Sequence, residues 1–188
     1  MKIKVNIPGI LARYSLLILS SLFNLWIFYF IFTPLTIYPV YAIMNYLVGA
    51  LLNGNNIVLI SGNTMGIIEM IPACIAGSAY FLLFILNMSV PNIKLKKRIK
   101  MILISFLSLL ILNIIRIVIL GTLLISGSSF FDITHKIFWY ALSTIFVVGI
   151  WFAEVKIFRI KDIPVFSDIK SLIHLMKKAR KSKRSNRN

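Results

Sequence analysis

Residues 72–77 of the chain read Pro-Ala-Cys-Ile-Ala-Gly and contain its only cysteine. They stand where a short irregular stretch rich in Gly and Asn gives way to a long apolar run. A single cysteine excludes an intrachain disulfide and a zinc or iron–sulfur centre built from cysteines. The thiol of Cys74 is therefore either a packing group or a nucleophile.

The composition around this stretch is that of an integral membrane protein. Of the 188 residues, 59% are hydrophobic and the mean hydropathy is +0.91, whereas about 45–50% apolar residues are usual in a soluble domain. Glu69 is the only charged residue within 14–93, and Arg116 is the only one within 101–131. Uncharged runs of this length indicate membrane spans.

The net charge of +16 gathers at the ends of the apolar runs, as the positive-inside rule expects of a membrane protein. We therefore expect no nucleic-acid partner. Five cations place the loop 94–100 in the cytoplasm. Eleven more follow between Lys156 and Arg187, and we expect segment 156–188 to form a basic amphipathic helix on anionic inner-leaflet lipids, followed by a tail.

The apolar runs predict about four transmembrane helices, in residues 14–33, 73–88, 101–125 and 137–155. The stretch Pro34–Leu52 holds two prolines and three tyrosines. We favour a helix on the outer surface there, because a second crossing would put loop 94–100 outside. Two short apolar runs joined by a Gly/Asn turn predict a hairpin or irregular segment before Cys74.

The predicted fold is therefore an all-α polytopic membrane protein with an outer interfacial helix and that short segment. Residues 1–13 would be a cytoplasmic amino terminus, 14–155 a single membrane-embedded catalytic domain, and 156–188 the basic cytoplasmic helix and tail. Both termini of this multi-pass protein would lie in the cytoplasm.

Three chemically distinctive residues are expected at one depth, the outer boundary of the membrane. Cys74 begins its span, and His135 precedes the last span. Arg116 lies about 24 Å from Lys100 along a helix at ~1.5 Å per residue. Each residue alone also has a simpler explanation. A lone cysteine in a membrane helix is usually a packing residue, an arginine can extend its charge to the membrane surface, and a histidine between a loop and a helix usually lies at the interface. An arginine inside a span nevertheless costs about 2.5–3.5 kcal/mol on insertion scales and normally faces a cavity or a partner.

Together the three side chains fit acyl transfer through a thioester. A helix amino terminus and the Arg116 cation would lower the pKa of the Cys74 thiol. The guanidinium can stabilise an oxyanion, and His135 can protonate the leaving amine and later activate the acceptor. These roles need no metal and no cofactor.

In order and spacing these residues resemble the exosortase/archaeosortase family of membrane-embedded cysteine transpeptidases, and so short a chain is more similar to its archaeosortase members. The resemblance covers residues 53–151 and rests on three motifs: Ala73-Cys74 followed by Gly77, Asn113-Ile114-Ile115-Arg116, and His135. The family has a small polar residue and Gly directly after the Cys, whereas Ile75-Ala76 stand here before Gly77.

The resemblance implies a thiol protease that cuts carboxy-terminal sorting signals of exported surface proteins at the outer face of the cell membrane. Its partners would be proteins with a motif, a membrane helix and a basic tail, and a lipid or glycolipid acceptor. Carried over to this chain, Cys74 is the nucleophile, Arg116 orients the substrate and stabilises the oxyanion, and His135 is the general acid and base.

The roles of three other polar residues are less defined. Asn113 would hold the guanidinium of Arg116. Asp132 would orient the imidazole of His135, with a solvated loop acid as the alternative. Glu69 is expected to be a solvated hairpin acid.

Two other classes of protein fit the same residues. In a small membrane transporter or substrate-binding subunit, Arg116 would bind an anionic solute and Cys74 would only pack. In a scaffolding membrane protein, the basic tail would recruit a cytoplasmic partner. Cys74→Ser separates the first class from a thiol enzyme, because only the enzyme needs the sulfur.

Overall fold

The computed structural model describes Ser15, Ile18, Leu19 and residues 25–62, 64–91, 93–139 and 143–160. The expected cytoplasmic segment 1–13 and almost all of the expected basic segment 156–188 lie outside these residues. In chain order the elements are α2 (Trp26–Val48), β1 (Ala50–Asn53), β2 (Asn56–Ser61), β3 (Thr64–Glu69), α3 (Pro72–Ile75), α4 (Gly77–Ser89), α5 (Leu95–Ile125), α6 (Phe131–Ile137) and α7 (Ser143–Ile157).

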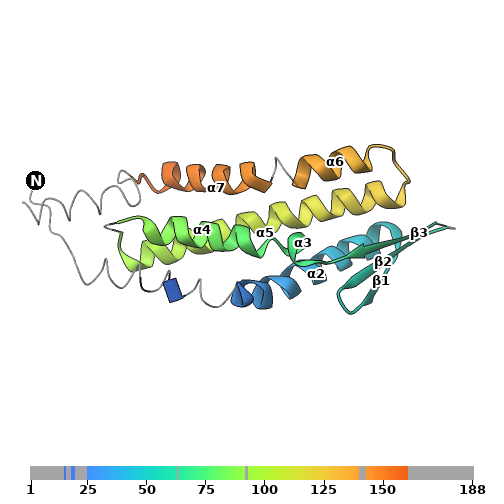
Figure 1. The fold of residues 1–188 in the computed structure, drawn as a ribbon, viewed down its shortest axis with the longest axis horizontal. Helices are drawn as coiled ribbons and strands as arrows, with labels where there is room; N and C mark the ends of the chain where they lie inside the picture. The colour runs from blue at the N-terminus through green and yellow to red at the C-terminus, as the bar shows by residue number, and fades with distance from the viewer. Residues whose placement is uncertain are drawn as a thin grey trace, which may run out of the picture.

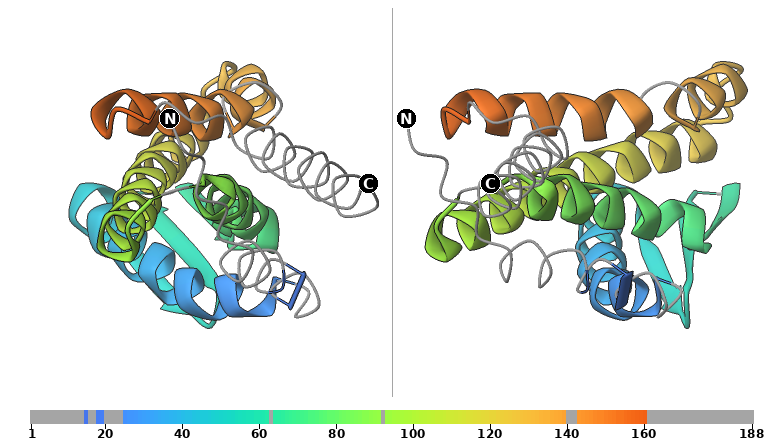
Figure 2. Two further views of the ribbon diagram at one scale, coloured as in Figure 1. Left: turned by 90° about the vertical axis from the view of Figure 1, so that its left-hand side faces the viewer. Right: turned by 60° about the vertical axis from the view of Figure 1, so that its left-hand side comes forward.

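Helix α5 is the axis of the molecule. Its 31 residues span about 46 Å at ~1.5 Å per residue. Elements α2, α3, α4, α6, α7, β2 and β3 all contact it. Helices α4 and α7 lie beside its first half, whereas α2, α6 and the sheet lie beside its second half (Figure 1). Helix α7 lies on the side of α4 and α5 opposite to α2 (Figure 2).

Three short antiparallel strands form a sheet in the order β1-β2-β3. The turns between them hold Gly54 and Gly62 at φ angles of 58° and 56°, a left-handed conformation that is costly for a residue with a Cβ. Ile57 and Leu59 of β2 are buried on the covered face, whereas Ile67 of β3 is 63% exposed. The alternation gives the sheet one face packed on the helices and one open face.

Strand β3 lies close against α5 because α5 carries Gly121 at the contact. A Cβ at that position would lie 2.8 Å from the Cδ1 atom of Ile68 and 3.0 Å from the Cε atom of Met44. The missing side chain therefore lets β3 and α2 approach α5, and this approach builds one wall of the site described below.

The expected all-α class is wrong, because of the three-stranded sheet. The expected number of spans is wrong as well. Among the described helices two, α2 and α5, are long and apolar enough to cross a membrane by length and composition. Helices α4 and α7 have 13 and 15 residues, about 20 and 23 Å against a hydrocarbon core of ~30 Å.

The expected span 73–88 is broken near its start. Ala76 adopts φ 60° and ψ 36°, which ends α3 and begins α4. A left-handed residue cannot continue a right-handed helix, so the apolar run forms one isolated turn followed by a shorter helix. Of the expected span 137–155, the structure describes the end of α6 at Ile137 and helix α7 from Ser143, and residues 140–142 lie outside the described residues.

Of the expected surface helix in 34–52, residues 34–48 are the later part of α2, with Pro34 and Pro39 inside the helix, and residues 50–52 belong to strand β1. Proline removes one main-chain donor from a helix. Here burial offsets that loss, since Val40 and Met44 are fully buried and α2 contacts α5 and strands β1 and β2. This part of α2 is therefore a core element.

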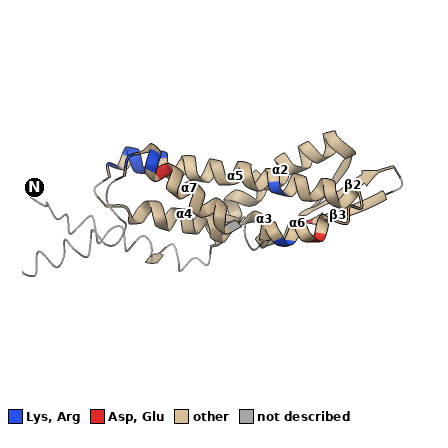
Figure 3. Ribbon diagram, turned by 90° about the horizontal axis from the view of Figure 1, so that it is seen from above, with Lys and Arg blue, Asp and Glu red and all other residues tan. Residues whose placement is uncertain are grey.

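Lysine and arginine gather at the end of the molecule where α5 begins and α7 ends (Figure 3). Two of these cations also hold main-chain carbonyls. Arg98 is 7% exposed and donates to the carbonyl oxygens of Asn87, Met88 and Val90 at the end of α4. Lys97 donates to the carbonyl oxygen of Phe158 at 2.7 Å. Helix ends leave such carbonyls without intrahelical partners.

Candidate active site

Cys74 lies in α3, a single turn held near the middle of the molecule (Figure 1). Pro72 is its first helical residue, where the fixed φ of proline suits a helix start. The N–H of Cys74 donates to the carbonyl oxygen of Ile71 at 2.8 Å. The thiol is half-buried, and its Sγ atom lies 3.7 Å from the carbonyl oxygen of Glu69, at the end of β3.

The backbone after Cys74 is fixed by packing as well as by its turn. A Cβ at Gly77 would lie 2.6 Å from the Cε1 atom of Tyr29 and 2.7 Å from its Cζ atom. Such contacts do not occur between real atoms, so the ring of Tyr29 requires glycine there. The glycine lets α4 begin against α2, directly behind the thiol.

Two buried side chains of α5 hold the carbonyls of α3. The side-chain amide of Asn113 donates to the carbonyl oxygen of Cys74 at 2.8 Å. The guanidinium of Arg116 donates through Nη2 to the carbonyl oxygen of Ala73 at 3.4 Å. The described hydrogen bond of Asn113 is therefore to the main chain of Cys74, whereas the sequence suggests the guanidinium of Arg116 as its partner.

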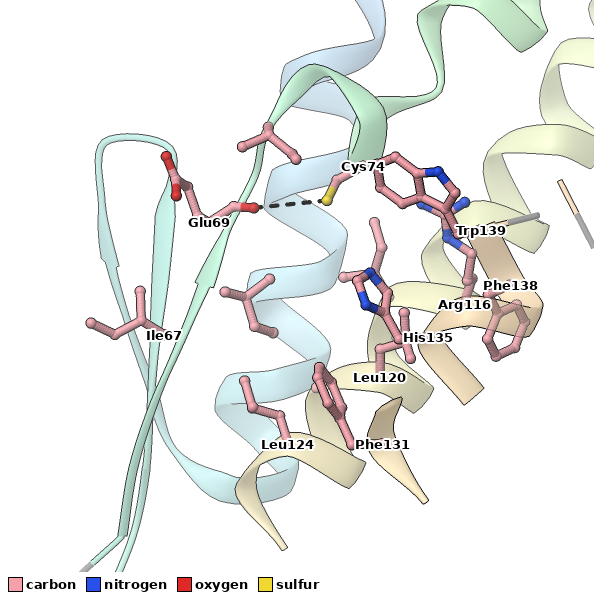
Figure 4. Close-up of a pocket in the computed structure, with 14 residues that line it drawn as sticks. Ile67, Glu69, Cys74, Arg116, Leu120, Leu124, Phe131, His135, Phe138 and Trp139 are labelled. Carbon is pink, nitrogen blue, oxygen red and sulfur yellow. Dashed lines mark hydrogen bonds between the residues drawn. The ribbon is translucent and has the colours of Figure 1, made fainter. Parts of the chain in front are cut away.

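A cavity of about 220 Å³ opens between β3, α5 and α6. Its walls are mostly apolar, and Cys74, Arg116 and His135 all line it. Figure 4 shows the thiol, the imidazole and the guanidinium around the same space. The structure thus brings together three residues that are distant in sequence, with Cys74 and His135 61 positions apart.

His135 reaches this cavity from α6. Its ring stacks on Phe131, with centroids 5.7 Å apart, and meets the edge of Trp139 at 5.9 Å. These two rings pack against the exposed imidazole. In the part of the chain that the structure describes, its nitrogens have no hydrogen-bond partner, and a neutral imidazole can both accept and donate a proton. Asp132 is exposed and does not line the cavity. Within the described residues no hydrogen bond joins Asp132 to His135.

Glu69 contributes its main chain rather than its carboxylate to the neighbourhood of the thiol. Its carbonyl oxygen faces the Cys74 sulfur, and its carboxylate points away from the sulfur (Figure 4). The side chain is exposed, as the sequence suggests for a solvated acid. A carbonyl acceptor at this place suits a thiol that still carries its proton.

Burial raises the pKa of the Cys74 thiol above its ordinary value, and the Arg116 guanidinium opposes that rise. The sequence suggests the reverse direction, because Cys74 is near a helix start. Helix α3 has four residues, so it sums few peptide dipoles, and the apolar walls disfavour the thiolate. The resting group is a neutral thiol, which needs a base to become a nucleophile.

A second polar cluster lies nearer the basic end of the molecule. The side-chain amide of Asn87 donates to the Oε2 atom of Glu154 at 3.1 Å and to the Oγ atom of Ser105 at 3.3 Å. All three side chains are buried, and they join α4, α5 and α7. The sequence predictions include none of these residues; the signal that points to them is Glu154, an acid inside an apolar run.

Among the residues that the structure describes, no group of three or more His, Cys, Asp or Glu side chains is placed to hold a metal ion. The described groups can instead supply a nucleophile, a proton acceptor and a cation around one cavity. No protein-family model, no curated protein and no solved structure matches the chain.

Proposed function

We propose that this chain is a membrane cysteine transpeptidase of the exosortase/archaeosortase type, which cuts the carboxy-terminal sorting signals of exported surface proteins and passes the acyl group to a lipid-type acceptor. One observation carries the proposal: Cys74, Arg116 and His135 line a single cavity. Their order in the chain and their chemistry match the family that the sequence resembles. The buried side-chain amide of Asn113 donates to the main chain of Cys74, which gives the asparagine of the motif Asn113-Ile114-Ile115-Arg116 a structural role beside the thiol.

The first half of the reaction forms a thioester. His135 takes the proton of the Cys74 thiol, and the sulfur attacks the carbonyl carbon of the scissile peptide. Arg116 stabilises the negative oxygen of the tetrahedral intermediate, since it lies beside the thiol and is held there by the carbonyl of Ala73. The carbon–nitrogen bond then breaks, and the departing amine takes the proton from His135.

The second half transfers the acyl group. The hydroxyl or amine of the acceptor loses its proton to His135 and attacks the thioester carbonyl carbon. The carbon–sulfur bond breaks, and the proton returns to the sulfur of Cys74. A raised pKa of the Cys74 thiol fits this cycle. The released sulfur takes up a proton at the end of each turnover, and His135 must remove that proton to start the next one.

The position of the cavity supports an outer-face reaction. Lysine and arginine gather where α5 begins (Figure 3), and the positive-inside rule assigns that end to the cytoplasm. Arg116 lies about 24 Å from Lys100 along α5 at ~1.5 Å per residue, near the far boundary of a ~30 Å core. A substrate arriving from outside would meet the cavity first.

The decisive experiment co-expresses the chain with an exported protein that carries a candidate motif, membrane helix and basic tail, and follows its processing. Cys74→Ala, Arg116→Ala and His135→Ala should each abolish or strongly reduce processing. Lys136→Ala is the matched control, because Lys136 is exposed on the same helix as His135 and does not line the cavity. Unaltered processing by all three cavity variants would contradict the proposal.

Two further measurements separate this enzyme from its alternatives. Cys74→Ser should lose nearly all processing, whereas a transporter that uses Arg116 for an anionic solute would tolerate it. A membrane-impermeant maleimide should label Cys74 when added outside the cell. Labelling from the cytoplasm alone would contradict the outer-face site.

A further inference from the structure

The free edge of β3 presents unused main-chain groups. Antiparallel strands bond through alternate residue pairs, and the tight turn at Gly62 makes Ser61 and Thr64 a bonded pair. Counting along the register, Gly66 and Ile68 bond to β2. The N–H and carbonyl of Ile67 and the N–H of Glu69 therefore point to the other edge of β3.

Two contacts agree with this assignment. The N–H of Met70 donates to the carbonyl oxygen of Asn55 at 3.1 Å, which continues the bonded side of the pair. The carbonyl oxygen of Glu69 instead faces outward, where it lies 3.7 Å from the Cys74 sulfur. By the same count, Ile67 and Val58 form a non-bonded pair, so neither the N–H nor the carbonyl of Ile67 bonds to β2.

This open edge borders the cavity and leads to the thiol. Ile67, Glu69 and Cys74 line the cavity together with apolar side chains of α5 and α6. In Figure 4, β3 with Ile67 and Glu69 lies on the opposite side of the cavity from His135, and the carbonyl of Glu69 lies beside the sulfur. A strand placed against Ile67 would continue past Glu69 and bring its main chain next to the Sγ atom.

We propose that the substrate binds as an extended peptide that adds a fourth strand to the free edge of β3, with Ile67 as its hydrogen-bonding anchor and its scissile bond beside Cys74. The inference deepens the proposed function and rests on it. Exposed strand edges are templates for such addition. The main chain of Ile67 offers one donor and one acceptor, as an incoming strand requires.

The cavity walls indicate which side chains the peptide carries. Alternate residues of an added strand point to opposite faces. Those turned toward α5 and α6 would meet Leu120, Leu124, Phe131 and Trp139, all of which line the cavity. We therefore expect apolar side chains at every second position of the bound segment.

The test uses the thiol itself as the reporter, since Cys74 is the only cysteine of the chain. The full chain in detergent micelles reacts either with iodoacetamide or with an iodoacetyl hexapeptide of alternating threonine and valine. Strand addition should make the peptide react about tenfold faster than iodoacetamide, as a few main-chain hydrogen bonds allow. The same peptide, N-methylated at alternate amides, should lose that advantage.

Ile67→Pro supplies the matching change in the protein. Proline removes the N–H that faces the edge and leaves the bonds of Gly66 and Ile68 to β2 in place. It should abolish the advantage of the peptide and leave the iodoacetamide rate within about twofold, the mark of an intact site. Leu52→Pro is the control, because Leu52 faces the opposite free edge of the sheet, on β1.

The outcomes separate this inference from the proposed function. A peptide advantage without any processing of tailed proteins would keep the strand site and contradict the enzyme. Processing that depends on Cys74, together with equal rates for the plain and N-methylated peptides, would overturn strand addition and keep the enzyme. An equal loss in Leu52→Pro would also overturn the role of Ile67.

Discussion

The side-chain amide of Asn113 donates a hydrogen bond of 2.8 Å to the main-chain carbonyl of Cys74, and so ties α5 to α3. Asn113 is 3% exposed, and its replacement by an apolar residue removes the donor that this half-buried carbonyl bonds to. Leaving such a group without a partner costs about 1–3 kcal/mol. The bond makes Asn113 a residue that positions the main chain of Cys74.

Asn113→Leu should lower the free energy of unfolding by about 1–3 kcal/mol, and Asn113→Asp should lower it more, since a carboxylate would face the carbonyl of Cys74. Both variants should change the rate at which iodoacetamide modifies Cys74 under native conditions, which a purely global loss of stability would not do. Denaturation in micelles and mass spectrometry measure the two effects. Wild-type stability and reactivity in Asn113→Leu would contradict this role.

The thiol should react slowly with iodoacetamide at neutral pH. Burial raises the pKa of Cys74, and since only the thiolate reacts, the rate should rise with pH to a midpoint above the ordinary value of about 8.5. The nearby guanidinium opposes this rise. Arg116→Met should therefore move the midpoint higher still, whereas Arg116→Lys should stay nearer the wild type. A midpoint below the ordinary value, or one unmoved by Arg116→Met, would contradict this account.

Arg98 should support stability more than its charged neighbours do. It is buried and donates to carbonyl oxygens at the end of α4, and hydrogen bonds from a charged group contribute about 1.5–3 kcal/mol. Arg98→Met should lower the free energy of unfolding by about that amount. Lys100→Met, at an exposed position on the same helix, should change it by less than about 0.5 kcal/mol. Equal effects would show that Arg98 acts only as a surface charge.

Arg98 also shows how far charge patterning carries a prediction of the fold. The sequence identifies loop 94–100 as a basic end, and the structure gathers lysine and arginine there (Figure 3). Charge alone does not show that Arg98 turns inward onto α4, because that depends on where the apolar run ends. The predicted lengths of the spans are wrong for a similar reason. The residues 73–88 form an unbroken apolar run in the sequence, whereas the left-handed backbone at Ala76 divides that run into two helices.

The sheet is the largest departure from the predicted fold. Gly/Asn turns and β-branched residues indicate the hairpin of β2 and β3, but β1 follows α2 after Gly49 alone. Its four residues read as the end of an apolar helix. Pairing with β2 decides their state, since strand preference depends more on context than helix preference does. The pattern of apolar residues in β1 alone does not show that the strand pairs with β2.

The three residues that the sequence singles out line one cavity, while their catalytic roles stay predictions. Cysteine, arginine and histidine are distinctive in an apolar chain, and positions along spans give an approximate depth for each. The sequence does not show what holds them. The bond from Asn113 to Cys74 joins residues 39 positions apart, and the direction of the Cys74 pKa depends on cavity walls from three separate elements.

Gly77→Ala should destabilise the chain, although alanine is ordinarily the better helix residue. A Cβ there would lie 2.6 Å from the ring of Tyr29, and overpacking of this kind costs about 1–3 kcal/mol. Gly149→Ala is the matched control in α7, where a Cβ meets nothing within 4 Å. It should instead stabilise the helix by about 0.5–1 kcal/mol.

A second change tests whether the ring of Tyr29 is the cause. Tyr29→Leu removes the atoms that Gly77→Ala would strike, so the double variant should lose less stability than the two single losses added together, with a coupling of about 0.5–3 kcal/mol. Unfolding in micelles measures the cycle. Gly77→Ala should also change the reactivity of Cys74, because α4 begins directly after the turn that carries the thiol. The double variant should bring that reactivity back toward the wild-type value. Additive losses would mean that Gly77 is required by its backbone alone.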